Sequence, residues 1–266
     1  MGLCALVTGG SRGIGEGIAT VLAHEGYDLA ITYSTAIDEA RETAEKIRLA
    51  GRHCFIYQAS LEQADVPAAI VQSAIKDLGH IDLLVNNAGL TRRGPLRTVT
   101  IEQLDFIYQL NWRAPLLCAK TAANHMIENN IRGNIINIAS TRGIRAYPDD
   151  HYYGGMKAAL IRSSESMALE MSRYGIRVNV VAPGATMVRG DISREQAGKV
   201  SWASKVPLGR FGTPEEVGHL VAYLASEQAA YITGAVVKID GGLILPGMPE
   251  DPSPEAGYGW AGPVKD

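Results

Sequence analysis

The sequence predicts an α/β protein with one doubly wound, mostly parallel sheet of about seven strands and helices on both faces. Short apolar runs alternate with longer amphipathic stretches along the chain, which is the rhythm of repeated β-α-β units. In the runs 81–85 and 134–138 apolar residues follow one another directly, as expected of strands that helices cover on both faces. With 266 residues and 46% hydrophobic content, the chain can bury the core of one large domain.

Each predicted element follows from its own stretch of sequence. Apolar runs predict strands at 3–7, 28–33, 53–57, 81–85, 134–138, 176–181 and 235–239. Amphipathic stretches predict helices from about residue 13 and at 36–50, 64–78 and 214–226. The last segment is rich in proline, which ends helices and central strands. We therefore expect one Rossmann-like domain over 1–243 and an irregular C-terminal extension over 244–266.

Composition and charge exclude several classes of function. The formal net charge of −3, with Lys and Arg scattered along the chain, creates no extended positive field, so nucleic acid is not an expected partner. The three cysteines lie far apart in apolar stretches, which fits reduced core thiols better than disulfides or a metal site. The six histidines show no metal-ligand spacing. Because no apolar run approaches the roughly 18 residues of a membrane span, we expect a soluble protein. The reduced thiols fit the cytoplasm, and the spacing of histidines and cysteines predicts no metal site.

The first chemical motif is a glycine-rich turn after the first predicted strand. The segment Thr8-Gly9-Gly10-Ser11-Arg12-Gly13-Ile14-Gly15 joins that strand to a helix. Glycines at such a junction let the backbone approach a pyrophosphate that rests on the helix N-terminus. The turn therefore predicts a dinucleotide site, with contacts from Gly9, Ser11, Arg12, Gly13, Ile14 and Gly15.

The second motif is the pair Tyr153 and Lys157. Residues four apart share a face of a helix, so the Lys157 ammonium is expected beside the Tyr153 phenol. A neighbouring positive charge lowers the pKa of a phenol from its ordinary value of about 10 toward the range that acid-base catalysis needs. We predict that Tyr153 is the group that transfers a proton.

These motifs, together with three others, resemble the short-chain dehydrogenase/reductase family over about residues 1–242. The Gly-x-x-x-Gly-x-Gly spacing after a threonine is typical of that family, and Asn86-Asn87-Ala88-Gly89 matches its segment after the fourth strand. Ser140 ends the fifth strand, thirteen residues before Tyr153, and Pro183-Gly184 follows the sixth. The resemblance implies an oxidoreductase that interconverts a secondary alcohol and a ketone with a nicotinamide cofactor.

The resemblance also implies a role for each site residue. Tyr153 would be the general acid/base and Lys157 would also hold the nicotinamide ribose. Ser140 would donate a hydrogen bond to the substrate oxygen, and Asn111 would position a water in a proton relay. A hydride would pass between the nicotinamide and the carbonyl carbon. The further cofactor contacts that the resemblance implies are Ser34, Ser60, Asn87, Ala88, Gly89, Pro183, Gly184 and Thr186.

The tip of the second predicted strand favours NADP(H). Ser34 and Thr35 stand there, and no acidic residue is present to bind a ribose 2′-hydroxyl and repel a 2′-phosphate. Arg12 resembles the basic residue found in NADP(H)-preferring members of the family. NAD(H), or use of both cofactors, is the alternative.

Two positions depart from the family pattern. Ser60 stands where the family usually has an aspartate that contacts the adenine amino group. Val188 stands where a threonine often binds the nicotinamide amide, and Thr186 lies two residues earlier. Neither change removes a predicted catalytic group, so both bear only on the cofactor contacts.

The substrate pocket is expected in the loops 90–96, 141–152 and 184–208, which follow the strand ends. The segment 127–137, with His151 near Tyr153, is similar to bacterial glucose dehydrogenases and favours a small sugar- or polyol-like substrate. The charged loop residues that could recognise it are Arg92, Arg93, Arg142, Arg145, Asp149 and Asp150.

Two alternatives remain open. The segment 87–92 resembles β-ketoacyl carrier-protein reductases, which would make the chain a 3-oxoacyl carrier-protein reductase, although 121–128 has almost no positive charge to meet an acidic carrier. A non-catalytic NADP(H)-binding sensor or scaffold is the alternative of another class, and the presence of Tyr153 and Lys157 speaks against it. The family resemblance further implies a homotetramer built through long helices near 101–129 and 152–173.

Overall fold

The computed structural model describes residues 2–188 and 203–245. The described residues form one sheet of seven parallel strands in the order β3-β2-β1-β4-β5-β6-β7. The strands are β1 Leu3–Val7, β2 Tyr27–Tyr33, β3 Cys54–Gln58, β4 Leu83–Asn86, β5 Asn134–Ile138, β6 Arg177–Pro183 and β7 Val236–Ile239. The order runs outward in both directions from β1 and β4, which is the doubly wound arrangement. The predicted fold class is confirmed, and each predicted strand is present within about two residues of its expected bounds.

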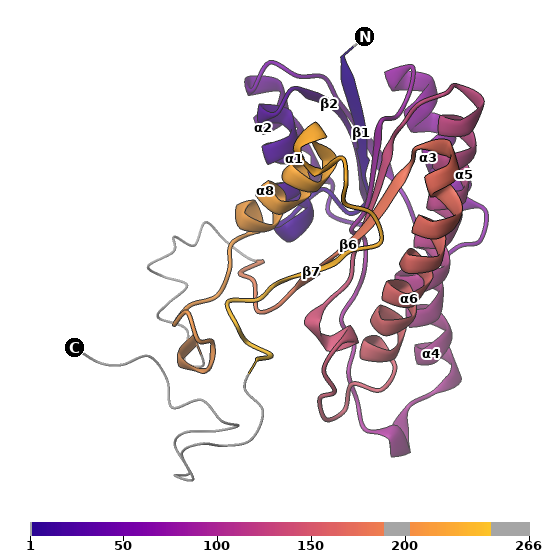
Figure 1. Ribbon diagram of the computed structural model, residues 1–266. Helices are drawn as coiled ribbons and strands as arrows, with labels where there is room; N and C mark the ends of the chain where they lie inside the picture. The colour runs from indigo at the N-terminus through magenta and orange to yellow at the C-terminus, as the bar shows by residue number, and fades with distance from the viewer. Residues whose placement is uncertain (1, 189–202, 246–266) are drawn as a thin grey trace.

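Helices cover both faces of the sheet (Figure 1). One face carries α1 Gly13–His24, α2 Ile37–Leu49 and α8 Pro214–Ala225. The other carries α3 Val66–Leu78, α5 Ala114–Glu128 and α6 Tyr153–Met171, with α4 Ile101–Tyr108 beside them. In β1, Val7 packs in the same core as Ile18 of α1, whereas its neighbour Leu6 packs in the same core as Val71 of α3. Adjacent apolar residues therefore serve opposite cores, which explains the continuous apolar runs.

The helices α1 and α8 touch along their backbones. A Cβ atom added to Gly17 would lie 2.4 Å from the carbonyl carbon of Pro214, and one added to Gly218 would lie 2.7 Å from the oxygen of Gly17. Only glycine allows this approach. Because α1 begins at the glycine-rich turn, the start of α8 helps to fix the position of that turn.

The long helix expected near 101–129 is interrupted in the structure. After α4 ends, the residues Gln109–Arg113 form a π-helical turn, and α5 starts at Ala114. A π turn inserts an extra residue into the helix and occurs often at functional sites. Asn111 lies in the middle of the turn and is completely buried. The second long helix, expected near 152–173, is α6.

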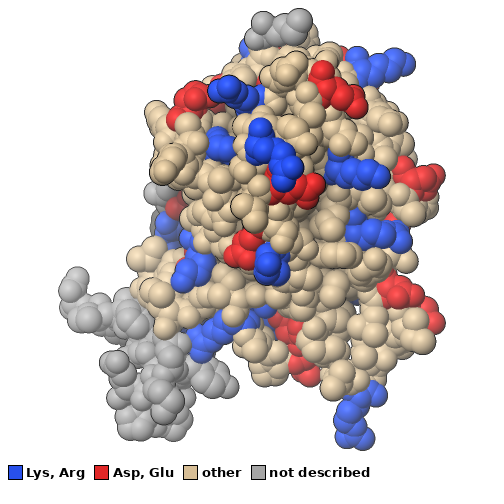
Figure 2. All heavy atoms as spheres, turned by 45° about the vertical axis from the view of Figure 1, so that its right-hand side comes forward, with Lys and Arg blue, Asp and Glu red and all other residues tan. Residues whose placement is uncertain are grey.

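The surface carries charged side chains of both signs (Figure 2). On the face drawn in Figure 2, basic and acidic side chains are intermingled. Within 2–188 and 203–245, no helix combines the length and apolar character needed to cross a membrane. Of the predicted C-terminal extension, only Ile244 and Leu245 belong to the described residues.

Candidate functional site

The predicted site residues gather at one edge of the sheet. The glycine-rich turn follows β1, Asn87 follows β4, Ser140 follows β5, and Gly184 follows β6. These four strands are neighbours in the order β1-β4-β5-β6 and all run in parallel. Their carboxyl ends therefore meet along one edge, which is where doubly wound sheets bind their ligands.

The glycine-rich turn has the backbone of an anion-binding junction. Gly9 and Gly13 have left-handed φ angles of +64° and +56°. A Cβ atom on Gly15 would lie 2.1 Å from the Gly9 oxygen, so the turn closes too tightly for a side chain there. The N-cap residue of α1, Arg12, makes no side-chain cap hydrogen bond. The first amides of α1 are thus left to an external acceptor, as a pyrophosphate site requires.

The segment after β4 is tied to this turn by hydrogen bonds. The backbone N–H groups of Asn87 and Ala88 both donate to the Thr8 hydroxyl oxygen, at 3.0 Å each. The Asn87 side-chain amide donates to the carbonyl oxygens of Thr8 and Gly9, also at 3.0 Å. Asn87 and Ala88 therefore lie beside the glycine-rich turn, whose residues are also predicted cofactor contacts. Thr8 was not among those contacts, and its place directly before Gly9 is the sequence signal that could have identified it.

Tyr153 and Lys157 lie one turn apart at the start of α6, and both are buried. The hydroxyls of Ser140 and Thr91 form hydrogen bonds with the Tyr153 phenol. The Lys157 ammonium donates to the Ile138 carbonyl oxygen at 2.8 Å and lies 5.9 Å from the centre of the Tyr153 ring. The structure thus brings Ser140, Tyr153 and Lys157 together, as predicted, and adds Thr91 to the phenol's partners.

Burial shifts the two titrating groups in opposite directions. It raises the pKa of Tyr153, and the hydrogen bonds from Thr91 and Ser140 oppose this rise only in part. It lowers the pKa of Lys157 to about 8, because the ammonium is desolvated. The lowered Tyr153 pKa that we expected from the helical spacing is not found. The ammonium lies beside the ring and is engaged by the Ile138 carbonyl, while desolvation acts directly on the phenol.

Asn111 faces the same site from the π turn. Its amide nitrogen donates to the Leu90 carbonyl oxygen at 3.2 Å, whereas its buried Oδ1 has no hydrogen-bond partner within the part of the chain that the structure describes. A Cβ atom on Gly89 would lie 2.6 Å from that Oδ1 and 3.4 Å from the Lys157 Nζ. The Asn111 Oδ1 and the Lys157 ammonium therefore both lie beside Gly89.

The remaining predicted cofactor contacts occupy both sides of this centre. Arg12 is 65% exposed, and its guanidinium lies 3.6 Å from the Glu39 carboxylate. Ser34 is exposed at the end of β2, and Ser60 lies two residues after β3. On the other side, the Gly184 N–H donates to the Ile239 oxygen at 2.9 Å. These positions suit an elongated ligand that crosses the carboxyl edge of the sheet.

The segment after Pro183 approaches the glycine-rich turn. A Cβ atom on Gly13 would lie 3.2 Å from the Val188 Cβ, so the two segments are in contact. Thr186 is paired with Gly212 in an isolated parallel bridge. Part of the predicted substrate loop 184–208, residues 189–202, lies outside the described residues.

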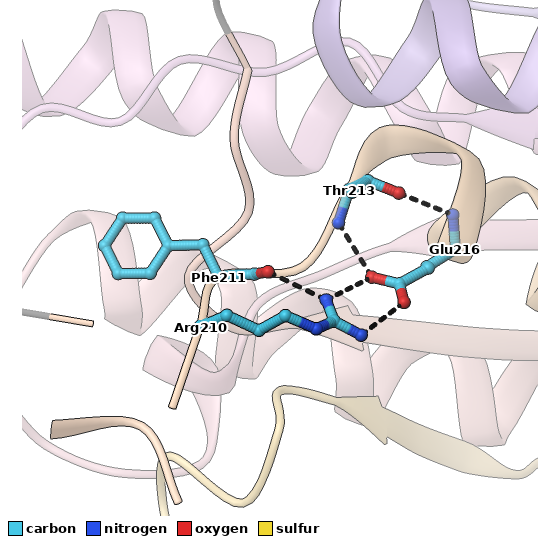
Figure 3. A network of polar contacts seen from close by, with 4 residues as sticks. All are labelled: Arg210, Phe211, Thr213 and Glu216. Atoms are coloured by element: carbon cyan, nitrogen blue, oxygen red, sulfur yellow. Dashed lines mark hydrogen bonds and ion pairs between the residues drawn. The ribbon is translucent and has the colours of Figure 1, made fainter. Parts of the chain in front are cut away.

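A network that the sequence reasoning missed holds Gly212 in place (Figure 3). The Arg210 guanidinium contacts both carboxylate oxygens of Glu216, at 3.0 and 2.7 Å, and donates to the Phe211 carbonyl oxygen at 2.9 Å. Glu216 also accepts from the Thr213 N–H at 2.9 Å, which closes the capping box of α8. The capping pattern Thr-x-x-Glu can be recognised in the sequence, but the sequence does not show that Arg210 pairs with Glu216.

The two substrate loops before α6 meet each other. The Gly94 N–H donates to the Asp149 oxygen at 2.9 Å, which joins the loops 90–96 and 141–152. Arg92 lies over the Phe106 ring at 5.1 Å. His151 is exposed and touches the Tyr152 ring edge-on. Its side chain therefore lies on the surface and is not enclosed in the site.

Arg142 and Asp150 form a buried ion pair next to Tyr153. The guanidinium lies 2.9 Å from Asp150 Oδ2, and the Asp150 side chain is only 2% exposed. Asp150 Oδ1 is buried and has no hydrogen-bond partner among the described residues. Both charges act on the Tyr153 phenol, with Asp150 raising its pKa and Arg142 lowering it. Of the six charged loop residues predicted as candidates, Asp150 and Arg142 are therefore the two that shift the pKa of Tyr153.

Known proteins share the sequence pattern over nearly the whole chain. A family model described as enoyl-(acyl carrier protein) reductase matches residues 9–244. The chain is 35% identical over 241 residues to the 3-oxoacyl-[acyl-carrier-protein] reductase FabG of Staphylococcus aureus, covering 91% of this chain and 98% of that protein. It is 32% identical over 246 residues to glucose 1-dehydrogenase 2 of Bacillus subtilis, covering 92% and 95%.

Solved structures share the fold. The acetoin dehydrogenase YohF of Salmonella typhimurium superposes with a TM-score of 0.87 at 35% identity, covering 92% of this chain and 97% of that one. A short-chain dehydrogenase/reductase of Serratia marcescens superposes with a TM-score of 0.83 at 35% identity, covering 91% and 97%. The chain therefore belongs to the short-chain dehydrogenase/reductase family and is an oxidoreductase of the kind that acts on a CH–OH group or a ketone with NAD(P)(H).

Proposed function

We propose that this oxidoreductase interconverts a secondary alcohol and a ketone on a small polar, sugar- or polyol-like substrate, with NADP(H) and with Tyr153 as the general acid/base. The observation that carries the proposal is the convergence of Ser140, Tyr153 and Lys157 at the carboxyl edge of the sheet, with Asn111 behind them. The cradle fits a dinucleotide because glycine is required at its tight points, Gly9, Gly13 and Gly15.

In this mechanism the protein holds the substrate oxygen and moves one proton. Ser140 and Tyr153 hydrogen-bond to the oxygen, and both stabilise the negative charge that develops on it. Tyr153 gives its phenolic proton to the oxygen during reduction and takes a proton back during oxidation. The nicotinamide, when bound, supplies or accepts the hydride. Lys157 positions the ribose, and Asn111 holds a water through which the phenol exchanges its proton with solvent.

Asp150 supports a hydroxylated substrate. A buried carboxylate oxygen without a partner costs free energy, so such an atom calls for a hydrogen-bond donor. Arg142 already neutralises the carboxylate through its other oxygen. A second hydroxyl of the substrate can donate to Asp150 Oδ1 without bringing in a charge. Names of relatives such as glucose 1-dehydrogenase and acetoin dehydrogenase agree with small oxygen-rich substrates.

NADP(H) is supported by the surface at the end of β2. Arg12 and Ser34 are exposed there, and the strand tip carries no carboxylate. Glu39 contacts Arg12 at 3.6 Å, and a 2′-phosphate would replace it as the partner of the guanidinium. NAD(H) is the alternative because that ion pair leaves less positive charge for a phosphate.

The second candidate is reduction of a 3-oxoacyl thioester on a carrier protein. It is favoured by the FabG relative, which matches over 91% of this chain. A 3-oxoacyl thioester offers no second hydroxyl that could donate to Asp150 Oδ1. We therefore rank this candidate function second.

The test is a spectrophotometric assay of reduced nicotinamide, with NADPH and then NADH, across sugars, polyols, hydroxyketones and 3-oxoacyl thioesters. We expect turnover of a hydroxylated substrate with NADPH, reduced about 10²–10⁴-fold in Tyr153→Phe, with NADPH binding retained. Activity confined to the thioesters would replace our proposal by the second candidate. Tight NADPH binding without turnover of any compound would instead indicate a non-catalytic sensor or scaffold.

A further inference from the structure

A cluster of Cys4, His80 and Asp82 lies at the opposite edge of the sheet from Tyr153. Cys4 is in β1, Asp82 directly precedes β4, and His80 follows the end of α3. This is the edge at which β1 begins, beside the N-terminus in Figure 1. The thiol, one imidazole nitrogen and one carboxylate oxygen all lie within 4.8 Å of one another. None of these residues takes part in the proposed reaction.

The cluster is held together by its own contacts. The His80 Nε2 lies 3.0 Å from Asp82 Oδ2, and the Cys4 N–H donates to the same oxygen at 2.8 Å. The Asp82 N–H in turn donates to the Cys4 carbonyl oxygen at 2.9 Å. Cys4 is 4% exposed, and the His80 and Asp82 side chains are 17% and 24% exposed. Backbone pairing between neighbouring strands thus fixes two of the three donor residues in place.

The spacing of the donors matches a zinc ion. Zinc binds thiolate sulfur at about 2.3 Å and imidazole nitrogen or carboxylate oxygen at roughly 2.0–2.2 Å, so tetrahedral ligand atoms lie roughly 3.3–3.6 Å apart. The nitrogen and oxygen of His80 and Asp82 are already 3.0 Å apart, and no pair exceeds 4.8 Å. Small side-chain rotations would therefore bring all three donors to one ion.

His125 of α5 lies outside this cluster. Its ring nitrogens are not among the ligand atoms that lie within 4.8 Å of one another. A zinc ion held by three protein ligands takes a water as its fourth.

We propose that Cys4, His80 and Asp82 bind one structural Zn²⁺ ion, with a water as the fourth ligand. Borderline-soft sulfur and nitrogen donors with one carboxylate are the set that zinc prefers over magnesium or calcium. On binding, the Cys4 thiol releases its proton to solvent. Thiolate, carboxylate and Zn²⁺ then sum to zero charge, which limits the cost of placing an ion at a mostly buried site. The ion would link β1 to the segment before β4, so it would act on stability and not on catalysis.

The experiment uses the purified full-length protein, freed of metal by a chelator and titrated with zinc chloride. We expect one Zn²⁺ per chain and a higher melting temperature in its presence. With cobalt chloride as the probe, coordination by Cys4 gives a thiolate-to-cobalt absorption band. These readouts do not depend on the oxidoreductase activity, so a failure here and a failure of the proposed function are distinguishable.

Variants assign the ligands. We expect His80→Gln to weaken Zn²⁺ binding by more than the roughly 10–100-fold that loss of an outer-shell partner costs, and Cys4→Ala to abolish the cobalt band. His219→Gln, at an exposed position on α8, is the matched control and should bind as the wild type does. His80 lies in a loop, so its variant reports on binding even if Cys4→Ala fails to fold. The proposal is overturned if no zinc binds, or if His80→Gln binds as tightly as the control.

Discussion

At the scale of single residues, Tyr153 and Lys157 share one helical turn, but burial acts on them differently. The phenol keeps its proton because burial raises its pKa, and the ammonium loses its proton more readily because burial lowers its pKa to about 8. Near neutral pH both groups are protonated in the free enzyme. This is the protonation state that reduction of a ketone requires, since Tyr153 must donate a proton and Lys157 must carry a charge.

The first prediction concerns the pH dependence of ketone reduction. Lys157 is charged below a pH of about 8 and neutral above it, and Tyr153 stays protonated to higher pH because its pKa is raised. We therefore expect kcat/KM for reduction to be constant below about pH 8 and to fall as pH rises through that value. The measurement is kcat/KM at saturating cofactor over about two pH units on each side. A flat profile through this range would show that the charge of Lys157 does not limit the reaction.

The second prediction concerns Asp150. If its free Oδ1 accepts a hydrogen bond from a substrate hydroxyl, Asp150→Asn should lower kcat/KM for a hydroxylated substrate by about tenfold or more. A simple ketone that lacks the second hydroxyl should lose much less. The neighbouring exposed residue Asp149 supplies the matched control, Asp149→Asn. An equal loss on both substrates would mean that Asp150 acts through Arg142 and the shape of the loop.

At the scale of elements, the site depends on junctions between segments that are distant in sequence. The bridge between Thr186 and Gly212 joins the segment after β6 to the segment before α8. The Met187 N–H donates to the Gly212 oxygen, and the Gly212 N–H donates to the Ala185 oxygen, both at 2.9 Å. Because Glu216 caps α8 while holding Arg210 (Figure 3), the ion pair stabilises the segment before α8 that carries Gly212.

The third prediction follows from that junction. Arg210→Gln should raise KM for the cofactor more than it lowers kcat, because the segment with Thr186 loses support while Tyr153 and Lys157 are untouched. We expect a loss in the free energy of unfolding of about 1 kcal/mol, since the pair is partly solvated. Arg162→Gln is the control, because Arg162 pairs with Glu165 on the exposed surface of α6. Steady-state kinetics and thermal melting separate the two effects, and a change in kcat alone would contradict a positioning role.

At the scale of the whole molecule, apolar side chains remain exposed on the helices that we expect to form a homotetramer. Leu169 on α6 is 80% exposed, and Ile101 on α4 is 72% exposed. Burying such side chains against another copy would gain roughly 1.5–3 kcal/mol for each large apolar residue. Leu49 on α2 is equally exposed, at 80%, but lies on the other face of the sheet.

The fourth prediction uses this contrast between the two faces. Leu169→Glu should shift the protein from tetramer toward smaller species, because a carboxylate cannot be buried unpaired in an apolar interface. Leu49→Glu, the matched control, should leave the assembly unchanged. Light scattering after size-exclusion chromatography measures the mass directly. Assembly that resists Leu169→Glu would exclude the end of α6 from the interface, and a monomeric wild type would refute the tetramer.

The strands and the glycine-rich turn are features that the sequence alone predicts. All seven strands and the fold class were predictable because burial on both faces leaves a local pattern of continuous apolar residues. The place of the glycine-rich turn followed as well, since parallel strands present all their carboxyl ends at one edge. Local pattern and the rules of parallel sheets were sufficient for these features.

Other features were decided by contacts between distant segments. Only the folded chain shows that Asn111 lies in a π turn, that Lys157 is engaged by the Ile138 carbonyl, and that burial raises the pKa of Tyr153. The pairing of Arg142 with Asp150, and the approach of Cys4 to His80 and Asp82, belong to the same class. The sequence by itself determined which segments are buried and which strand ends converge, because periodicity records burial. The tertiary structure decided which side chains meet and how far each is desolvated, because these depend on packing between segments that no local pattern connects.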